Sequence, residues 1–209
     1  STPHSLVGNI LTSACFEDAA TGDLWFTTYN AVHRYVRDYD HFDTFQLKDS
    51  TRKPLVEDYY AFHLDRQGRL WLRVGDGGNG FLHLFDTRTG RDSIVCPLGG
   101  YRSVVIPDKD GEAAQVLSSV FSTPGLEIID LQNGFAKRAY FREGPEASVV
   151  NETFVENDTL VWLGLSNGIA AFNPQTGTSK VYAEMNGQPA DDVWSVRPYG
   201  QHLLFAPTP

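Results

Sequence analysis

The chain has 209 residues, 41% hydrophobic and 21% charged, which is the composition of an ordinary globular sequence with enough apolar surface for a sizeable core. Its 17 basic and 26 acidic residues give a net charge of −9, and no run of Lys or Arg offers a basic stripe for phosphate backbones, so we expect no direct contact with nucleic acid. No stretch of about 18 apolar residues occurs, so we expect no membrane contact by this segment, and no leader peptide is recognisable at Ser1.

A short apolar motif with a central tryptophan recurs along the chain. Its copies are Leu24-Trp25-Phe26, Leu70-Trp71-Leu72 and Val161-Trp162-Leu163, and Leu203-Leu204-Phe205 is a fourth copy centred on leucine. The central residues are 46, 91 and 42 positions apart, so the middle gap holds two periods and predicts a further copy near residue 116. The sequence Gln115-Val116-Leu117-Ser118 lies there without a tryptophan. A period of 20–50 residues is typical of repeat folds.

A strand and a turn follow each centre. The predicted strands are residues 31–36, 81–86, 125–130 and 168–173, and three of them end in a turn that runs from Asp or Asn to Gly: Asp86 to Gly90, Asp130 to Gly134 and Asn173 to Gly177. The Asp or Asn side chain can cap such a turn, and glycine accepts the positive φ that closes it. In the first repeat Asp40 takes the glycine position, and Asp can adopt the left-handed conformation.

Two further strands complete each repeat. One precedes the centre, over residues 10–18, 59–65, 101–108, 149–157 and 193–199, and another follows the Asp-to-Gly turn, as in residues 94–96, 138–141 and 180–182. Four short antiparallel strands every 40–50 residues indicate an all-β fold, a β-propeller. We expect one partial propeller over residues 1–209, with blades at about 4–50, 56–98, 101–146 and 149–190 and an incomplete fifth blade at 191–209. Because a propeller closes a ring, the chain is either a fragment of a larger, seven-bladed ring or an open arc whose end faces need covering, and we favour the fragment.

The residues at these repeated positions resemble those of a known family. Glu17-Asp18, Gly22 and Leu24-Trp25-Phe26 resemble the two-component regulator propeller repeat, and so do Asp65, Gly68 and Leu70-Trp71. Trp162-Leu163-Gly164 with Asn167-Gly168-Ile169 resembles the second half of that repeat, and Asp192-Val193-Trp194 resembles its beginning. The third repeat departs most, with an insertion around Lys109-Asp110-Gly111. WD and kelch repeats fit less well.

The resemblance implies a location and a function. Propellers of this family form the periplasmic sensor of bacterial histidine kinases, hybrid two-component systems or one-component regulators, commonly as seven-bladed rings. It therefore implies a periplasmic ligand-sensing module of a receptor, with a small polar ligand such as a glycan, contact with the remainder of the same receptor, and a homodimer in the full receptor. It implies no enzyme in this chain, although a histidine kinase can follow elsewhere in the receptor.

Catalytic and metal-binding patterns are weak. We interpret Asp18, Asp65, Asp86 and Asp130 as turn caps because they occupy fixed positions of the repeat. His33 and His83 share one strand position on different blades, which favours surface or interface packing over a shared metal ion. Cys15 and Cys96 are expected to be free, buried thiols. We therefore predict no cofactor, no metal and no catalytic residue.

The ligand is expected on the face that carries the loops between second and third strands and the connections between blades. Aromatic rings beside amides and carboxylates suit the apolar faces and hydroxyl edges of sugars. The candidate contacts are Tyr29, Asn30, Tyr59, Tyr60, Arg73, Asp76, Asn79, Tyr101, Asn167 and Trp194. Asp76 and Asn79 flank a glycine-rich loop that lacks the residues of an EF-hand or a P-loop. Two alternatives stay open: a propeller enzyme such as a polysaccharide lyase or glycoside hydrolase, and a protein-interaction platform.

Overall fold

The computed structural model describes residues 6, 10–48, 53, 55, 57–76, 79–100, 102–110, 112–119, 123–133, 135–141, 147–185, 187–200 and 202–207. They form β-strands and one 3-10 turn, and none of their helices is long and apolar enough to cross a membrane.

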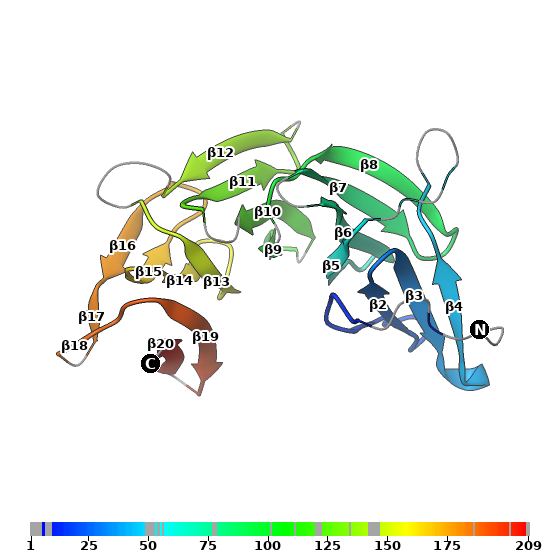
Figure 1. The fold of residues 1–209 in the computed structure, drawn as a ribbon, viewed down its shortest axis with the longest axis horizontal. Helices are drawn as coiled ribbons and strands as arrows, with labels where there is room; N and C mark the ends of the chain where they lie inside the picture. Colours follow the sequence, from blue (N-terminus) through cyan, green and yellow to red (C-terminus); the bar gives the residue numbers. More distant parts are fainter. Residues whose placement is uncertain are drawn as a thin grey trace. The chain divides into compact units, whose positions relative to one another are not determined.

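Among the described residues, four sheets each contain four consecutive antiparallel strands (Figure 1). The first sheet consists of β1 (Phe16–Glu17), β2 (Leu24–Thr28), β3 (Ala31–Val36) and β4 (His41–Phe45), and η1 (Arg37–Tyr39) lies between its last two strands. The second consists of β5 (Tyr59–Leu64), β6 (Arg69–Asp76), β7 (Asn79–Asp86) and β8 (Arg91–Pro97). The third consists of β9 (Arg102–Pro107), β10 (Ala113–Ser119), β11 (Leu126–Asp130) and β12 (Ala136–Tyr140), and the fourth of β13 (Val150–Val155), β14 (Val161–Leu165), β15 (Gly168–Phe172) and β16 (Ser179–Tyr182).

Two smaller sheets follow. One joins β17 (Glu184–Met185) to β18 (Gln188–Pro189), and the other joins β19 (Val193–Tyr199) to β20 (His202–Pro207). Sheets that run simply from the first strand to the fourth are propeller blades, so the sheet of β19 and β20 is the beginning of a fifth blade.

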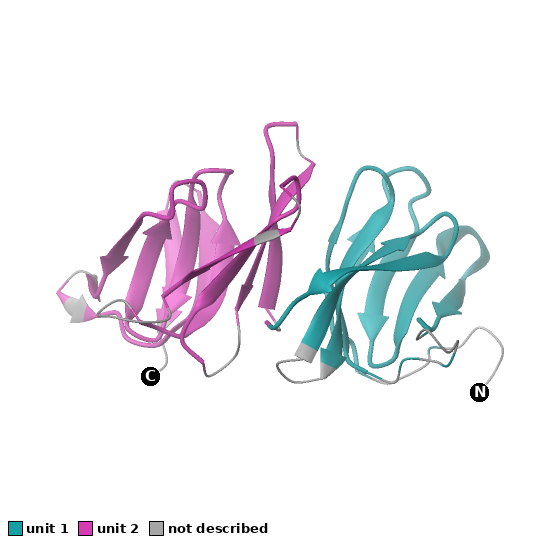
Figure 2. Ribbon diagram, turned by 90° about the horizontal axis from the view of Figure 1, so that it is seen from above, with its two compact units in different colours: residues 1–99 teal, residues 100–209 magenta. Residues whose placement is uncertain are grey.

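The chain forms two compact units, Ser1–Gly99 and Gly100–Pro209 (Figure 2). The first unit contains blades one and two, and the second contains blades three and four with the fifth sheet.

Aromatic side chains hold the first two blades together. Trp25 of β2 lies 5.7 Å from Phe45 of β4 and 5.8 Å from Phe85 of β7, measured between ring centroids, and Phe45 lies 5.3 Å from Phe85. Trp25 and Phe85 are almost completely buried. Phe85 is therefore the residue of the second blade that fills the space between two strands of the first. Burial of such large rings between blade faces stabilises the unit.

The second unit repeats this arrangement. Phe172 of β15 lies 5.1 Å from Tyr140 of β12 and 5.7 Å from Phe141, again between ring centroids. Phe172 occupies the position of Phe85, because Phe85 pairs with Leu70 and Phe172 with Val161, each one residue before the tryptophan.

The centre of the third repeat is Leu117, beside the predicted Val116. Leu117 packs into the core shared with the fourth blade, as Trp25 packs into the core shared with the second. Strand pairing agrees: Tyr140 pairs with Leu126, which pairs with Ser119, and Phe45 pairs with Val32, which pairs with Thr27. Ser119 and Thr27 each lie two residues after the centre of their repeat. Val116 is also fully buried, and its pairing with Ile129 places it at the position of Leu70 and Val161, so Leu117 alone takes the place of the tryptophan.

The predicted turn caps are confirmed. The carboxylate of Asp86 accepts the backbone N–H groups of Arg88 and Thr89, and Asp130 and Asn173 accept the equivalent pairs in their own turns. Gly90 and Gly177 have φ of +67° and +74°. Asp40 has φ 48° and ψ 49°, so it adopts the left-handed conformation expected in the glycine position.

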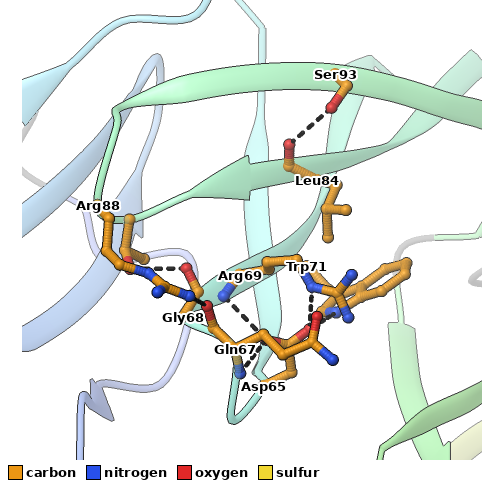
Figure 3. Close-up of polar contacts among 9 residues, drawn as sticks. Asp65, Gln67, Gly68, Arg69, Trp71, Leu84, Arg88 and Ser93 are labelled. Carbon is orange, nitrogen blue, oxygen red and sulfur yellow. Dashed lines mark hydrogen bonds and ion pairs between the residues drawn. The ribbon is translucent and has the colours of Figure 1, made fainter. Parts of the chain in front are cut away.

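Asp65 caps a larger group of donors (Figure 3). It accepts the backbone N–H of Gln67 at 3.0 Å and of Arg69 at 2.9 Å, the Arg69 Nε at 2.7 Å and the indole Nε1 of Trp71 at 3.1 Å. Its side chain has no exposed surface, and the arginine beside it supplies the compensating charge. One carboxylate thus ties the turn to the tryptophan of the same repeat.

Both cysteines are free, but the expectation that they are buried is wrong for Cys15. Cys15 is exposed because it precedes the short strand β1 and lies outside the sheet, whereas Cys96 is half-buried within β8.

Candidate functional site

The turns between second and third strands lie beside the connections between sheets, at one face of each unit that we call the connection face. In the first unit the N–H of Asn30 donates to the carbonyl of Glu57 at 3.1 Å. In the second unit Gly125 donates to Ser148 at 3.0 Å, and Asp192 donates to Ser166 at 3.1 Å. These bonds attach each turn to the segment that leads into the next sheet. Backbone hydrogen bonds therefore fix these turns to the connections within each unit.

The predicted aromatic and amide residues of the first unit divide into two groups. Tyr29, Asn30 and Tyr60 are half-buried, and Asn30 has φ +73° in the β2–β3 turn. Tyr59 is completely buried, and its hydroxyl accepts the N–H of Leu47 at 3.1 Å and donates to the carbonyl of Leu55 at 3.0 Å. Tyr59 therefore packs between the blades, and only the first three remain candidates for ligand contact.

Arg73 lies inside the second blade. It is completely buried, and its Nη1 donates to the carbonyl of Gly75 at 2.9 Å. Gly80 lies directly over the guanidinium, where a Cβ would come within 2.5 Å of Nε. The glycine therefore makes room for the arginine, which supports the loop backbone from below. Asp76 and Asn79 pair with each other at the ends of β6 and β7. Tyr101 lies outside the described residues.

Asn167 belongs to a polar cluster in the second unit. The hydroxyl of Ser148 donates to Asn167 Oδ1 at 2.7 Å and lies 3.0 Å from the hydroxyl of Ser166. Ser166 Oγ in turn accepts the N–H of Val149 at 3.2 Å. Ser166 is exposed and Asn167 half-buried, so hydroxyl and amide groups reach the surface of the connection face from a fixed base.

Two β-bulges place further side chains next to this cluster. In β13 the register shifts between Val150 and Glu152, and in β19 it shifts between Val193 and Ser195. The extra residues are Asn151 and Trp194, which occupy equivalent positions in successive sheets. A bulge re-aims the side chain of the extra residue. The Nδ2 of the buried Asn151 donates to Asp192 Oδ1 at 3.0 Å, which joins the two sheets.

The Trp194 ring also contacts a cationic side chain. The guanidinium carbon of Arg102, an exposed residue at the start of β9, lies 5.4 Å from the centroid of the Trp194 ring. This contact has the geometry of a cation–π interaction. Arg102, Asn151 and Trp194 thus come from the first strands of the third, fourth and fifth blades. Because Asn151 is buried, the groups that can meet a polar molecule are the Trp194 ring, the Arg102 cation, the Asp192 carboxylate and the Asn167 amide.

Sequence reasoning identified Asn167 and Trp194 but missed Arg102, Ser148, Asn151 and Asp192. Each missed residue lies within the connections or first strands that the repeat pattern places on this face, so its position in the repeat was the available signal. Their partners depend on two bulges, and the repeat pattern gave no indication of those.

A hollow lies at the opposite end of the strands in the second unit. It has a volume of about 310 Å³ and is lined by residues of four turns, among them Asp108, Gln132, Asp158 and Gln175. Gln132 donates to Asp108 at 3.3 Å and Gln175 to Asp158 at 3.2 Å. The turns here join first to second and third to fourth strands, so this hollow is separate from the connection face.

The histidines that share one strand position, His33 and His83, lie inside the blades. The ring nitrogens of His33 lie 2.9 Å from Thr28 Oγ1 and 3.1 Å from Thr44 Oγ1, and the Nδ1 of His83 lies 3.0 Å from Asp92. Both rings are almost completely buried. Among the described residues no group of three or more His, Cys, Asp or Glu side chains could hold a metal ion.

Together these features define a partial β-propeller that carries a polar cluster on its connection face. Comparison with solved structures agrees. The extracellular domain of BT3049 from B. thetaiotaomicron, assigned to hybrid two-component systems, has a TM-score of 0.66 and 17% identity, over 99% of this chain and 27% of that one. The extracellular domain of BT4673 from the same organism, assigned to one-component systems, has a TM-score of 0.65 and 19% identity, over 96% of this chain and 27% of that one.

Other propellers are also similar. The β-propeller domain of Cps50 (Swd1) from Myceliophteria thermophila has a TM-score of 0.62 and 13% identity, over 98% of this chain and 63% of that one. A puromycin hydrolase has a TM-score of 0.53, with 14% identity over 84% of this chain and 32% of that one. At these identities the likeness establishes the fold, and the chain spans about a quarter of the first two structures. No protein-family model and no curated protein matches the sequence. The β-propeller is confirmed, and the resemblance to sensor propellers is confirmed at the level of fold.

Proposed function

We propose that this chain is an extracytoplasmic ligand-sensing module of a bacterial two-component or one-component receptor. The observation that carries the proposal is the group of Arg102, Asn167, Asp192 and Trp194, with the buried Asn151 bonded to Asp192, on a fold similar to extracellular domains of such systems. The ligand is a small polar molecule, an oligosaccharide in the first instance, because the group offers an amide and a carboxylate that can bind hydroxyl groups beside an indole ring.

In this proposal the chain binds a ligand and catalyses no reaction. The ligand shifts the receptor between two states by binding one of them more tightly, and the chain passes that difference to the remainder of the receptor, a homodimer in the periplasm. The half-buried residues Tyr29, Asn30 and Tyr60 lie on the connection face of the first unit and are candidate ligand contacts of that unit by itself.

The test is a screen of the intact extracellular region on a broad glycan array, followed by calorimetry of every hit. We expect saturable binding in the micromolar range, and unchanged oligosaccharide after prolonged incubation, as measured by chromatography. Absence of binding across the array would remove the proposed ligand class. Release of shortened or unsaturated sugars would identify a propeller enzyme instead, the alternative that the similar fold of a hydrolase keeps open.

A further inference from the structure

The side chain of Arg102 carries a positive charge that no described residue of the second unit neutralises. The other described arginines of that unit have partners, since Arg138 donates to two backbone carbonyls and Arg197 donates to Glu152 at 3.2 Å. Arg102 is exposed, and its side-chain contact among the described residues is the ring of Trp194. The face of an indole attracts a cation but has no acceptor atom for its N–H groups. The donors of the guanidinium are therefore available to a ligand.

Backbone contacts fix the point from which Arg102 projects. Arg102 pairs with Ser119, and the hydroxyl of Ser119 donates to the carbonyl of Val150 at 3.2 Å. Gly100 lies so close to this pair that a Cβ on it would come within 2.6 Å of the carbonyl oxygen of Ser119. The start of β9 is thus attached to the end of β10 and, through it, to the start of β13 in the next blade.

The serine cluster leaves a second group of donors, on the amide of Asn167. The single proton of the Ser148 hydroxyl goes to Asn167 Oδ1 at 2.7 Å, so Ser166 is the donor in the 3.0 Å contact between the two hydroxyls. Ser166 Oγ itself accepts the N–H of Val149. The acceptor oxygen of the amide is therefore occupied, and no described residue accepts from Asn167 Nδ2.

Asp192 connects this cluster to the aromatic ring. Its N–H donates to a backbone carbonyl of the cluster at 3.1 Å, its Oδ1 accepts the Nδ2 of Asn151 at 3.0 Å, and Trp194 follows two residues later. Arg102 and Asn167 thus offer N–H donors, whereas the acceptor oxygens Asn167 Oδ1 and Asp192 Oδ1 already have donors. A ligand that matches this surface must supply acceptor atoms, and a negative charge among them would pair with the arginine.

We propose that the ligand is an acidic oligosaccharide, whose carboxylate is bound by Arg102 and Asn167 while its hydroxyl groups donate to Asp192. This inference rests on the proposed function and adds to it the class of sugar, one that contains a uronic acid. A guanidinium presents its N–H groups in a planar fork that matches a carboxylate, and such charge-assisted hydrogen bonds are stronger than those between neutral groups. The net charge of −9 disfavours anions at long range, so selection of an acidic sugar comes from direct contact with these donors.

Matched pairs of sugars test the role of the carboxylate. Oligosaccharides of galacturonic or glucuronic acid, and the same molecules after reduction of their carboxylates to neutral alcohols, are titrated into the intact extracellular region and followed by calorimetry. An acidic sugar should bind at least tenfold more tightly than its neutral form. Equal binding of the two forms, or tighter binding of sulfated than of carboxylated sugars, would overturn this inference and leave the sensing proposal standing. Absence of binding by every sugar would remove both.

Three substitutions assign the effect to particular side chains. Arg102→Gln should weaken binding of the acidic sugar at least tenfold and change that of the neutral form less than twofold. Asn167→Asp keeps the acceptor for Ser148 but replaces the donor by a negative charge, so it should act in the same way. Arg197→Gln removes the same charge from an exposed arginine that already has Glu152 as its partner, and should change both affinities less than twofold.

Near-ultraviolet circular dichroism checks that each variant is folded, and Asn167→Asp carries the test if Arg102→Gln is not. A loss that is the same for acidic and neutral sugars, or the same for Arg102→Gln and Arg197→Gln, would overturn the inference, because the arginine would then act on the fold or on the overall charge.

Discussion

Asp65 shows how much one buried side chain can support. Its carboxylate accepts four hydrogen bonds, two from backbone N–H groups, one from Arg69 and one from the indole of Trp71. Asp65→Ala should lower the free energy of unfolding by about 2–4 kcal/mol, because the buried donors lose their acceptor. Asp86→Ala, at an exposed turn of the same blade, should cost about 1 kcal/mol. Urea titration measures both, and a loss at Asp65 no larger than that at Asp86 would show that the carboxylate is only a turn cap.

Tyr59 gives the protein a dependence on alkaline pH. Burial raises the pKa of the Tyr59 phenol to about 12, against the opposing effect of the Leu47 N–H. In the unfolded chain the group ionises near pH 10, so ionisation favours the unfolded state as the pH rises from about 10 to about 12. The stabilisation from this group is complete below the lower value and is lost through the upper one.

The variant Tyr59→Phe tests this dependence. At pH 7 it should be about 1–2 kcal/mol less stable than the parent chain, because Leu47 and Leu55 lose their hydroxyl partner. Between pH 10 and 12 the parent chain alone carries the titrating phenol, so the difference should shrink. Urea titrations of both proteins across this range cancel the contributions of the other tyrosines. A constant difference would mean that the phenol titrates equally in both states.

At the scale of the strand, Phe172 anchors the fourth blade to the third. It is completely buried and touches Tyr140 and Phe141. Phe172→Ala should lower the free energy of unfolding by about 3–5 kcal/mol, the usual cost of emptying a large aromatic site in a core. Leu204→Ala, on an exposed strand position, should stay within about 0.5 kcal/mol of the parent chain. Thermal or urea unfolding compares the two, and similar values would mean that the blades are not held by this ring.

The strands and turns were predictable from the sequence because each repeat must bury the same positions and close the same turns. Asp86, Asp130 and Asn173 could be identified as caps since their side chains act on neighbouring backbone, within three residues. The centre of the third repeat was less certain. This repeat has no tryptophan, and two buried apolar neighbours, Val116 and Leu117, fit the central position. Packing against the fourth blade and strand pairing distinguish them.

The candidate site was harder to predict than the fold. Asn167 and Trp194 followed from their place in the repeat, whereas their neighbours are brought together by bulges at Asn151 and Trp194 that a period-based pattern does not encode. Tyr59 and Arg73 had the right position and residue type for a ligand, but they are buried because the adjacent blade and Gly80 cover them. Position along a strand therefore predicted the face, and burial decided which residues can meet a ligand.

At the scale of the whole molecule, the proposal of a sensor requires that ligand binding depend on one end of the strands and be indifferent to the other. Arg102→Ala and Asn167→Ala alter the connection face of the second unit, whereas Gln132→Ala and Asp158→Ala alter the hollow at the opposite end. Once a glycan is identified on the intact extracellular region, calorimetry should show at least tenfold weaker binding, about 1.4 kcal/mol, for the first pair and less than twofold change for the second. Arg102 is exposed, so its removal tests recognition with little effect on folding. The reverse ranking would move the binding site to the acidic hollow, where carboxylates and glutamines of four turns would then be the groups that select the ligand.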